Sequence, residues 1–415
     1  MYKTDVAIIG IGRVGLPLAL SLLESGFKVI GVDTNQETVD LVNSQKMPFD
    51  ETGCEELIKK VNLETTTDIS QVEFAQNLII TVGTPLVQHI ETDLSQINKV
   101  VDNIIPYLRH GHNIILRSTI APKTTEYIKK KIEQKTCLVA GETLFISFCP
   151  ERIAEGKALE EIKELPQIIG CEDQKSFDMA KNIFSRLTPN LFRTTYTAAE
   201  LVKLFNNISR YINFAVANQF AIISENYNEN INDIIHMANY KYPRGNIAKP
   251  GFTAGTCLRK DFGMINESNP YSDILLSAWK INEFMPKFLV DNLKTKTEMY
   301  NKNITILGYS FKSDTDDTRD SLIPKLIRYI EREVPKSIKI HDPYLSVIID
   351  NVFENVEIDD ALEGADILYI GTNHKQFMAS KAHILNKISK ECWIVDIWDV
   401  FKTGKIFFKV GGIEY

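Results

Sequence analysis

The most chemically suggestive stretch of the sequence surrounds Cys257. Small residues dominate the approach from Pro250 to Thr256, and Lys260 and Asp261 follow the cysteine closely. A neighbouring lysine favours the thiolate, which is the nucleophilic form of a cysteine. Alone, such a cysteine is more simply interpreted as a small buried hydrophobic residue. The nucleophile hypothesis therefore depends on supporting groups elsewhere in the chain.

One candidate for support is a helical stretch that carries Glu200, Lys203 and Asn207. Residues three and four apart share one face of a helix, so these side chains point in a common direction. Lys203 and Asn207 together offer the donors that a developing oxyanion requires. The alternative is a solvated polar face, which is the commoner meaning of such a triplet.

Glu151 follows Pro150 at the end of a strand-like apolar run. Loops at the carboxyl ends of parallel strands are where α/β sheets bind ligands. Glu151 is therefore a candidate site residue, and an ordinary surface glutamate is the alternative.

A glycine-rich turn lies near the N-terminus, where Gly10, Gly12 and Gly15 follow a strand and open a helix. Glycines permit a tight turn and close approach of the backbone to a pyrophosphate, and the helix N-terminus offers free N–H groups. Asp33 ends the next strand, where its carboxylate suits the ribose hydroxyls of NAD and repels the 2′-phosphate of NADP. The motif predicts NAD binding, although FAD and an empty βα turn share this pattern.

Strands and helices must alternate to position these groups. Five short apolar runs read as strands of a parallel sheet with crossover helices. They are Val6–Ile9, Lys28–Val32, Leu78–Val82, Asn113–Arg117 and Leu144–Cys149.

The pattern then becomes helical. Ala198–Asn226 predicts one unusually long helix, and helical spacing returns from Ser272 to about Tyr300. Alternation resumes near Asn303, with further strands expected at Ile304–Leu307, Ile338–His341, Ile367–Ile370 and Trp393–Val395. The chain reads as α/β, then helical, then α/β.

Composition limits the class of protein. The 415 residues are enough for two or three domains, and 44% hydrophobic with 24% charged content is typical of a globular protein. A net charge of −7 argues against a nucleic-acid binder. The six cysteines form no paired C-x-x-C, so neither zinc nor a disulfide framework is indicated. With no visible signal peptide or membrane-length apolar run, the cytoplasm is the expected compartment.

Together these motifs resemble the UDP-glucose/GDP-mannose dehydrogenase family. The resemblance covers nearly the whole chain, and the number and order of the motifs make it specific. The motifs are Gly10–Pro17, Thr81–Pro85, Ser118–Pro122, Cys149–Gly156, Glu200–Asn207, Gly255–Asp261, Phe311–Ser321 and His341–Pro343.

The resemblance implies an α/β fold with three parts and a homodimer or a higher oligomer. Residues 1–196 would form a Rossmann-type NAD-binding domain, and residues 197–300 a central helical domain with the cysteine and the dimer interface. Residues 301–415 would form a Rossmann-like α/β domain for the nucleotide sugar. No metal, nucleic-acid or membrane partner is implied.

The family oxidises a primary alcohol at sugar C6 to a carboxylate with two NAD⁺. By resemblance, Cys257 is the nucleophile that makes the aldehyde tetrahedral and becomes a thioester. Lys203 and Asn207 stabilise the oxyanions, Asp261 and Thr119 position water or protons, and Glu151 assists thioester hydrolysis.

The resemblance also assigns the binding residues. Thr84, Thr119, Lys260 and Arg319 match positions near the cofactor, beside the glycine loop and Asp33. The substrate would be contacted by Lys312 of the C-terminal domain and by an arginine, matched here by Arg244, that enters the neighbouring subunit's site. The remaining substrate positions are Glu151, Arg152, Lys203, Asn207 and Gly255.

Two stretches disagree about the sugar. The Cys149–Arg152 segment, the helix from Asn207 to Asn218 and the region from Met237 to Ile247 resemble the UDP-N-acetylhexosamine branch. Thr256-Cys257 with Lys260-Asp261 resembles the UDP-glucose branch instead. The longer stretch carries more weight, so we expect a UDP-N-acetylhexosamine, with UDP-glucose as the alternative.

One departure affects the diphosphate. Trp398 stands where many members carry a diphosphate-binding arginine, so that role passes to Lys312, Arg244 or another group.

Two rival hypotheses about the function remain. One is a two-electron dehydrogenase of the 3-hydroxyacid type, and the other is a non-catalytic NAD- or nucleotide-sugar-binding regulator.

Overall fold

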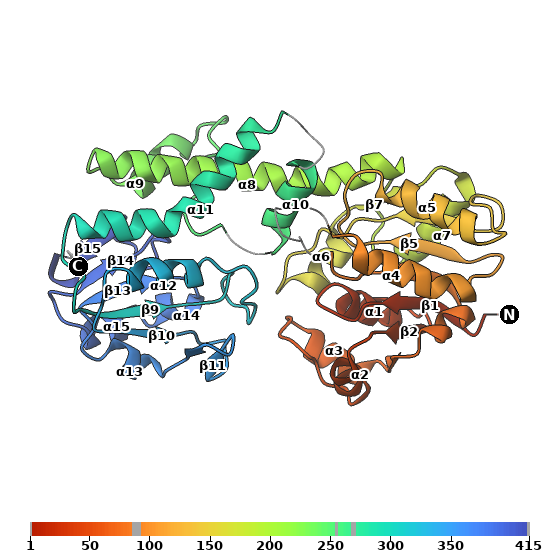
Figure 1. The fold of residues 1–415 in the computed structure, drawn as a ribbon, viewed down its shortest axis with the longest axis horizontal. Helices are drawn as coiled ribbons and strands as arrows, with labels where there is room; N and C mark the ends of the chain where they lie inside the picture. The colour runs from red at the N-terminus through yellow and green to blue at the C-terminus, as the bar shows by residue number, and fades with distance from the viewer. Residues whose placement is uncertain (1, 85–92, 254–255, 267–270, 413–415) are drawn as a thin grey trace. The chain divides into compact units, whose positions relative to one another are not determined.

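The computed structural model describes residues 2–84, 93–253, 256–266 and 271–412, and for residues 256–259 and 266 the description stops at the backbone. The chain forms two compact units (Figure 1). The first comprises Met1–Asn206 and Lys260–Pro270, and the second comprises Asn207–Arg259 and Tyr271–Tyr415. No helix among the described residues has the length and apolar character needed to cross a membrane.

The first unit is built on an eight-stranded sheet in the order β3-β2-β1-β4-β5-β6-β7-β8. Its strands are β1 (Thr4–Ile9), β2 (Val29–Val32), β3 (Glu64–Thr66), β4 (Ala75–Ile80), β5 (Asn113–Leu116), β6 (Phe145–Phe148), β7 (Gln167–Gly170) and β8 (Leu191–Thr194). The central strands are almost entirely buried, as expected for apolar runs that are covered on both faces.

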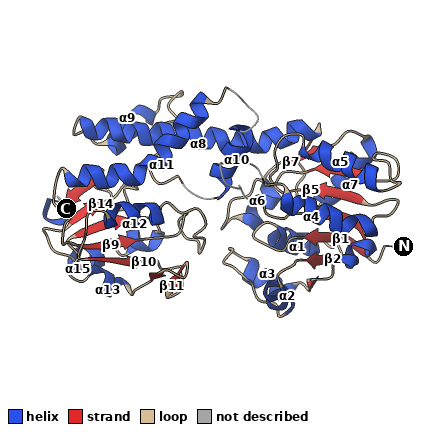
Figure 2. Ribbon diagram, viewed as in Figure 1, coloured by secondary structure: helices blue, strands red, loops and turns tan. Residues whose placement is uncertain are grey.

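Helices cover this sheet on both sides (Figure 2). They are α1 (Gly15–Glu24), α2 (Gln36–Asn43), α3 (Cys54–Lys60), α4 (Ser95–Ile104), α5 (Thr124–Lys135), α6 (Ala158–Glu164) and α7 (Gln174–Phe184). Leu16, Leu18 and Leu20 of α1 are fully buried in the core. That packing fixes the start of α1 beside the end of β1, where the glycine turn lies.

The expected parallel sheet is interrupted at one place. The chain turns back at Pro150 after β6, so β7 pairs with β6 in the antiparallel sense at Phe148 and Gly170. The strands from β3 to β6 pair in parallel throughout. The expected Rossmann-type order is therefore present, with one antiparallel step between β6 and β7 near the β8 edge.

The long helix expected at Ala198–Asn226 is α8 (Tyr196–Asn226), which has 31 residues. It begins in the first unit and continues into the second. The second unit also contains α9 (Ile231–Asn239) and α11 (Asp273–Lys294), whereas α10 (Thr256–Asn266) is divided between the units.

The C-terminal sheet has the order β10-β9-β13-β14-β15. Its strands are β9 (Asn303–Leu307), β10 (Ser337–His341), β13 (Ile367–Ile370), β14 (Trp393–Val395) and β15 (Phe407–Lys409). A two-stranded ribbon adds β11 (Ile348–Ile349) and β12 (Phe353–Glu354), and the covering helices are α12 (Ile323–Glu331), α13 (Ile358–Leu362), α14 (Lys375–Ala379) and α15 (Lys381–Lys387). The sheet is parallel except for β15, which pairs antiparallel to β14.

Candidate active site

The glycine turn has the geometry of a dinucleotide-binding loop. Gly10 has φ +98°, a conformation that side chains disfavour, and a Cβ there would lie 3.1 Å from the Thr81 carbonyl oxygen. A Cβ on Gly15 would overlap the Gly10 carbonyl oxygen. A Cβ on Gly12 would meet nothing within 4 Å. Gly10 and Gly15 therefore serve the fold, whereas Gly12 keeps space open above the turn.

Asp33 links the end of β2 to this turn. Its Oδ2 accepts the Ile11 N–H at 2.7 Å, and its Oδ1 accepts the Asn35 N–H at 2.9 Å. The half-buried carboxylate keeps further acceptor positions on each oxygen, as ribose hydroxyls require. The open Gly12 and the oriented Asp33 together fit NAD.

Three of the predicted cofactor residues come together in the first unit. Lys260 Nζ donates to Thr84 Oγ1 at 3.1 Å, and Thr84 Oγ1 donates to the Thr119 carbonyl oxygen at 2.5 Å. Thr84 is 2% exposed. This chain joins α10 to the ends of β4 and β5, which are the carboxyl ends where an α/β sheet binds its ligand.

Glu151 is buried and is not a surface residue. Its Oε2 accepts Arg117 Nε at 2.7 Å and also contacts Arg117 Nη2, and its Oε1 accepts the N–H groups of Arg152 (2.7 Å) and Ile153 (3.1 Å). Arg117 is itself 3% exposed, bonds the carbonyl of Cys149 and Gln167 Oε1, and stacks on Phe184.

Arg117 is a site residue that the sequence reasoning missed. It was assigned to the end of a strand with no role in the site. Neighbouring parallel strands pair Leu116 with Phe148, which brings the next residues of each strand together. A buried arginine needs an anionic partner, so the strand pairing and Glu151 were the signal that could have found it.

Arg152 points its guanidinium at the carbonyl oxygen of Pro166. Burial lowers the pKa of this guanidinium, against the opposing effect of Glu151. Its placement beside Glu151 is compatible with the predicted substrate role, which no contact in the structure tests.

The polar face of α8 is divided between structure and site. Glu200 is fully buried and accepts the N–H groups of Lys123 (2.7 Å) and Thr125 (2.9 Å) at the start of α5, together with the Thr125 hydroxyl. Burial raises the pKa of this carboxyl, although these hydrogen bonds oppose the shift. Glu200 thus docks α8 on the N-terminus of α5, and the face is not solvated at this point.

One turn further along α8, Lys203 is half-buried and Asn207 is 5% exposed. Arg210 donates to Asn207 Oδ1 at 2.9 Å. The amide of Asn207 is therefore oriented with its carbonyl oxygen toward Arg210.

Cys257 lies in the first turn of α10, and its side chain is outside the described part of the structure. Gly255, predicted to contact substrate, is likewise outside it. Asp261 lies one turn after Cys257 on the same helix and is fully buried.

The other five cysteines have ordinary environments. Cys54, Cys149, Cys171 and Cys392 are buried, and Cys137 is exposed. Burial raises the pKa of Cys54, Cys149 and Cys392 to about 12, so these thiols stay protonated at neutral pH. Among the described side chains, no group of three or more His, Cys, Asp and Glu residues is arranged to hold a metal ion.

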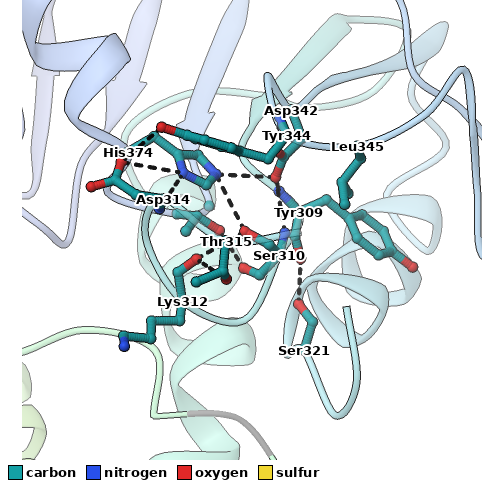
Figure 3. A network of polar contacts seen from close by, with 12 residues as sticks. Tyr309, Ser310, Lys312, Asp314, Thr315, Ser321, Asp342, Tyr344, Leu345 and His374 are labelled. Atoms are coloured by element: carbon teal, nitrogen blue, oxygen red, sulfur yellow. Dashed lines mark hydrogen bonds and ion pairs between the residues drawn. The ribbon is translucent and has the colours of Figure 1, made fainter. Parts of the chain in front are cut away.

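The second unit carries the remaining predicted residues. Lys312 lies in the loop after β9, and Figure 3 shows its side chain pointing away from a buried polar network. Arg319, in the same loop, donates from Nε to both carboxylate oxygens of Asp317, at 2.9 and 3.0 Å. Arg244 is exposed, and it stacks on Tyr242 while donating to its hydroxyl at 3.0 Å.

Trp398 packs against the segment that leads toward Cys257. A Cβ on Gly251 would overlap the Trp398 ring, and Phe252 meets that ring edge-on at 6.4 Å. Trp398 Nε1 donates to the Gly371 carbonyl at 3.0 Å, and Gly251 N–H donates to the buried Asn218 at 2.9 Å. Trp398 therefore has a packing role at the position that many family members give to arginine.

Comparison with known proteins covers all parts of the chain. The NAD-binding domain of the UDP-glucose/GDP-mannose dehydrogenase family matches residues 4–188, its central domain residues 197–283, and its UDP-binding domain residues 305–403. The chain is 34% identical over 392 residues to a UDP-N-acetyl-D-mannosamine dehydrogenase of Methanocaldococcus jannaschii, covering 93% of this chain and 89% of the relative.

Comparison with solved structures supports the same family. The UDP-N-acetyl-D-mannosamine dehydrogenase of Pyrococcus horikoshii superposes with a TM-score of 0.85 at 30% identity, covering 92% of this chain and 93% of that one. A UDP-glucose dehydrogenase from Pyrobaculum islandicum shares the fold with a TM-score of 0.81 at 21% identity, covering 91% of each chain. The chain therefore belongs to the UDP-glucose/GDP-mannose dehydrogenase family and is an NAD-dependent nucleotide-sugar dehydrogenase.

Proposed function

We propose that the substrate is a UDP-N-acetylhexosamine, with UDP-N-acetyl-D-mannosamine as the first choice, and that its C6 alcohol is oxidised to a carboxylate. The observation that carries this proposal is the similarity to proteins named UDP-N-acetyl-D-mannosamine dehydrogenases, which extends over at least nine-tenths of the chain. The resemblance of the Cys149–Arg152 segment to the same branch agrees with it.

The chemistry requires two oxidations at one carbon. NAD⁺, when bound, accepts the hydride in each of them. After the alcohol becomes an aldehyde, the Cys257 thiolate adds to the aldehyde carbon, and a C–S bond and an oxyanion form. Lys203 and Asn207, one turn apart on α8, stabilise that oxyanion with an ammonium and an amide donor.

Loss of the second hydride from this adduct leaves a thioester on Cys257. Water adds to the thioester carbon, the C–S bond breaks, and the carboxylate leaves with the thiol restored. One alcohol, two NAD⁺ and one water thereby give one carboxylate, two NADH and three protons. Asp261 and Thr119 are the proposed groups for positioning water and moving protons.

Glu151 enters the proposal as a fixed carboxylate. Its contacts with Arg117 and with two backbone N–H groups hold the loop of Arg152 in place. The proposal keeps Glu151 beside thioester hydrolysis, with Arg117 as the group that positions it. Gly10, Gly12, Gly15, Asp33, Thr84, Lys260 and Arg319 are proposed to serve the cofactor, and Arg152, Arg244, Gly255 and Lys312 the substrate.

The three-domain division at about residues 196 and 300 belongs to the same proposal, as does a cytoplasmic location. The proposed homodimer would use one face of α8 and α11. This face carries the half-exposed Val216 and Phe220 and the largely exposed Ile274, around a mostly apolar groove of about 330 Å³. Exposed apolar patches of this kind mark protein–protein contacts.

The substrate test is a turnover assay of the full chain with NAD⁺ and UDP-N-acetylmannosamine, UDP-N-acetylglucosamine, UDP-glucose and GDP-mannose. We expect two NADH for each sugar acid, with UDP-N-acetylmannosamine used best. Equal or better use of UDP-glucose would replace the proposed sugar, and one NADH per substrate would reject the covalent route.

The nucleophile test is Cys257→Ser. Loss of a covalent nucleophile should reduce acid formation by at least roughly a thousandfold. The matched control is Cys137→Ser, which alters an exposed cysteine and should leave turnover unchanged. Full conversion to the acid by the Cys257→Ser protein would contradict the thioester mechanism.

The dimer test is light scattering of the full chain after size exclusion. Ile274→Glu, which places a charge on the apolar face, should convert a dimer into monomers. Val347→Glu is the control, because Val347 is equally exposed at 70% but lies in the C-terminal domain. A monomeric parent protein, or a dimer unaffected by Ile274→Glu, would contradict the proposed interface.

A further inference from the structure

A buried carboxylate organises the loop that carries Lys312. Asp342, at the end of β10, is 1% exposed. Its Oδ2 accepts the N–H groups of Tyr309 (2.7 Å) and Ser310 (3.0 Å), and its Oδ1 accepts the Tyr344 N–H at 3.0 Å. Although burial opposes it, His374 and the backbone N–H groups of Ser310 and Tyr309 hold the pKa of Asp342 below its usual range. The carboxylate is thus a fixed anion at the start of the loop.

His374 completes the network from the other side (Figure 3). It is fully buried, and its Nε2 lies 3.1 Å from Asp342 Oδ2. Its Nδ1 accepts the backbone N–H of Asp314 at 2.9 Å. A backbone N–H is always a donor, so the ring proton must lie on Nε2, from which it is donated to Asp342. One imidazole therefore joins the fixed anion to the far side of the loop.

The bond to Asp314 restrains a backbone that has an unusual conformation. Asp314 has φ +58°, which residues with a Cβ rarely adopt. Its Oδ1 accepts the Lys375 N–H at 3.0 Å, and its own N–H is held by His374. Such conformations persist where the surroundings over-determine them.

Lys312 lies between these anchors. Its carbonyl oxygen accepts two hydroxyl donors, Ser310 Oγ and Thr315 Oγ1, each at 3.0 Å. Ser310 and Thr315 are both buried. The backbone of Lys312 is therefore fixed on both sides, while its side chain points away from the network (Figure 3).

We propose that the His374–Asp342 pair is a positioning device that fixes the loop of residues 309–315 so that Lys312 presents its ammonium to the phosphates of the nucleotide sugar. This inference rests on the proposed function for the identity of the ligand. It gives a buried imidazole, four residues beyond β13, a role in substrate binding without contact with substrate.

The residue at position 398 explains why Lys312 needs a fixed backbone. Trp398, at the position where many members carry an arginine, packs on Gly251 and bonds Gly371. A flexible lysine is a poor substitute for an arginine fork unless its backbone is held still, because its own stem loses conformational entropy on binding. Pre-organisation of the loop reduces that cost.

The test is calorimetric titration of the full chain with UDP. His374→Phe keeps a ring but removes its hydrogen bonds, and should weaken UDP binding roughly tenfold. Thr315→Val removes one donor to the Lys312 carbonyl and should weaken binding by roughly threefold. Affinity for NAD⁺ should stay unchanged in both variants. The control is His383→Phe, which alters an exposed histidine paired with Asp359 in the same domain.

A double-mutant cycle separates positioning from general damage. Lys312→Ala should weaken UDP binding strongly in the parent and much less in the His374→Phe background, because the lysine is already misplaced there. Additive effects, or unchanged UDP affinity in both His374→Phe and Thr315→Val, would overturn the inference. If His374→Phe fails to fold, Thr315→Val carries the same cycle.

Failure of the proposed function can be distinguished from failure of the positioning role. A parent protein that does not bind UDP would reject the nucleotide-sugar assignment. Hydrogen exchange would still report on the loop, since the amides of residues 309–315 should exchange faster in His374→Phe than in His383→Phe. Equal exchange would overturn the positioning role independently.

Discussion

The two sheets of the protein share one plan at their first turns. In each, the first strand is followed directly by a glycine of positive φ, Gly10 at +98° and Gly308 at +92°. In each, that glycine N–H bonds the last residue of the next strand, at 2.8 Å in both cases. In each, an aspartate just beyond that strand accepts a hydrogen bond from the backbone of the turn. Asp33 accepts the Ile11 N–H in one sheet, and Asp342 accepts the Tyr309 N–H in the other.

The plan diverges in what surrounds the aspartate. Asp33 is half-buried beside the open space over Gly12. Asp342 is buried against His374, and the turn beyond Gly308 continues with Tyr309 and Ser310. The same position thus remains accessible to the proposed ligand in one sheet and serves the fold in the other, because neighbouring side chains decide which groups are covered.

The units also treat buried charge differently. The first pairs Glu151 with a permanently charged arginine, Arg117. The second pairs Asp342 with the imidazole of His374, and it buries Asp396 with backbone N–H donors, including Phe401 N–H at 2.9 Å. Burial raises the pKa of Asp396 to about 6. Four predictions test this contrast, beginning with the largest effect.

Arg117→Leu should cost about 3–5 kcal/mol in unfolding free energy, because it leaves the Glu151 carboxylate buried without its cation. Urea titration followed by fluorescence measures this. The double variant Arg117→Leu/Glu151→Leu should recover most of the loss. A single variant within about 1 kcal/mol of the parent would show that the pair is not needed for stability.

Asp396 should make the stability of the C-terminal unit decrease as the pH rises through the mildly acidic range. Its pKa is raised in the folded state, so its contribution to stability is complete below about pH 4 and is lost as the pH rises through about 6. Asp396→Asn should gain about 2 kcal/mol over the parent between pH 4.5 and pH 7.5, from the pKa difference of about two units. The measurement is the variant-minus-parent unfolding free energy in urea at each pH, and a difference that does not change with pH would refute it.

Gly12→Ala should separate binding from folding in the first sheet. A Cβ there meets no protein atom within 4 Å, so the melting temperature should stay near that of the parent. The methyl group occupies the space expected for the pyrophosphate and should weaken NAD⁺ binding roughly thirtyfold, or about 2 kcal/mol. UDP binding is the internal control and should not change. Equal NAD⁺ affinity would mean that the cofactor avoids this turn.

Asp33→Asn should have the smallest effect. The amide oxygen can still accept the Ile11 N–H, so the turn should remain intact, but the negative charge near the ribose is lost. NAD⁺ affinity should fall roughly tenfold while the discrimination against NADP⁺ decreases. Steady-state kinetics with both cofactors decides this, and undiminished selectivity for NAD⁺ would assign that selectivity to another group.

Much of the fold was predictable because local patterns agreed with it. The strand at Ile304–Leu307 lies within β9, the strand at Trp393–Val395 is β14 itself, and the 31-residue α8 was expected from its uninterrupted helical spacing. The antiparallel step at Phe148 and Gly170 was not predictable, because strand direction depends on where the chain returns after Pro150.

The candidate site shows the same division. Residue type and spacing predicted site roles for Gly10, Asp33 and the Lys203–Asn207 pair. The sequence did not predict the hydrogen-bond partners of Glu151 and Glu200. Arg117 lies 34 positions from Glu151, and Thr125 lies 75 positions from Glu200. Hydrogen bonds of that range leave no periodic trace in a sequence.

The sequence by itself determined the class of chemistry and the family, because glycines that form a tight turn, an acid at the end of the next strand and a cysteine with nearby polar residues are local requirements of the reaction. Only the tertiary structure decided which acids remain available for chemistry. Glu200, Asp342 and Asp33 look alike in one dimension, but packing buries the first two against backbone donors and leaves the third half-exposed. Accessibility is a property of the surroundings, and the surroundings are assembled from residues that are far apart in the chain.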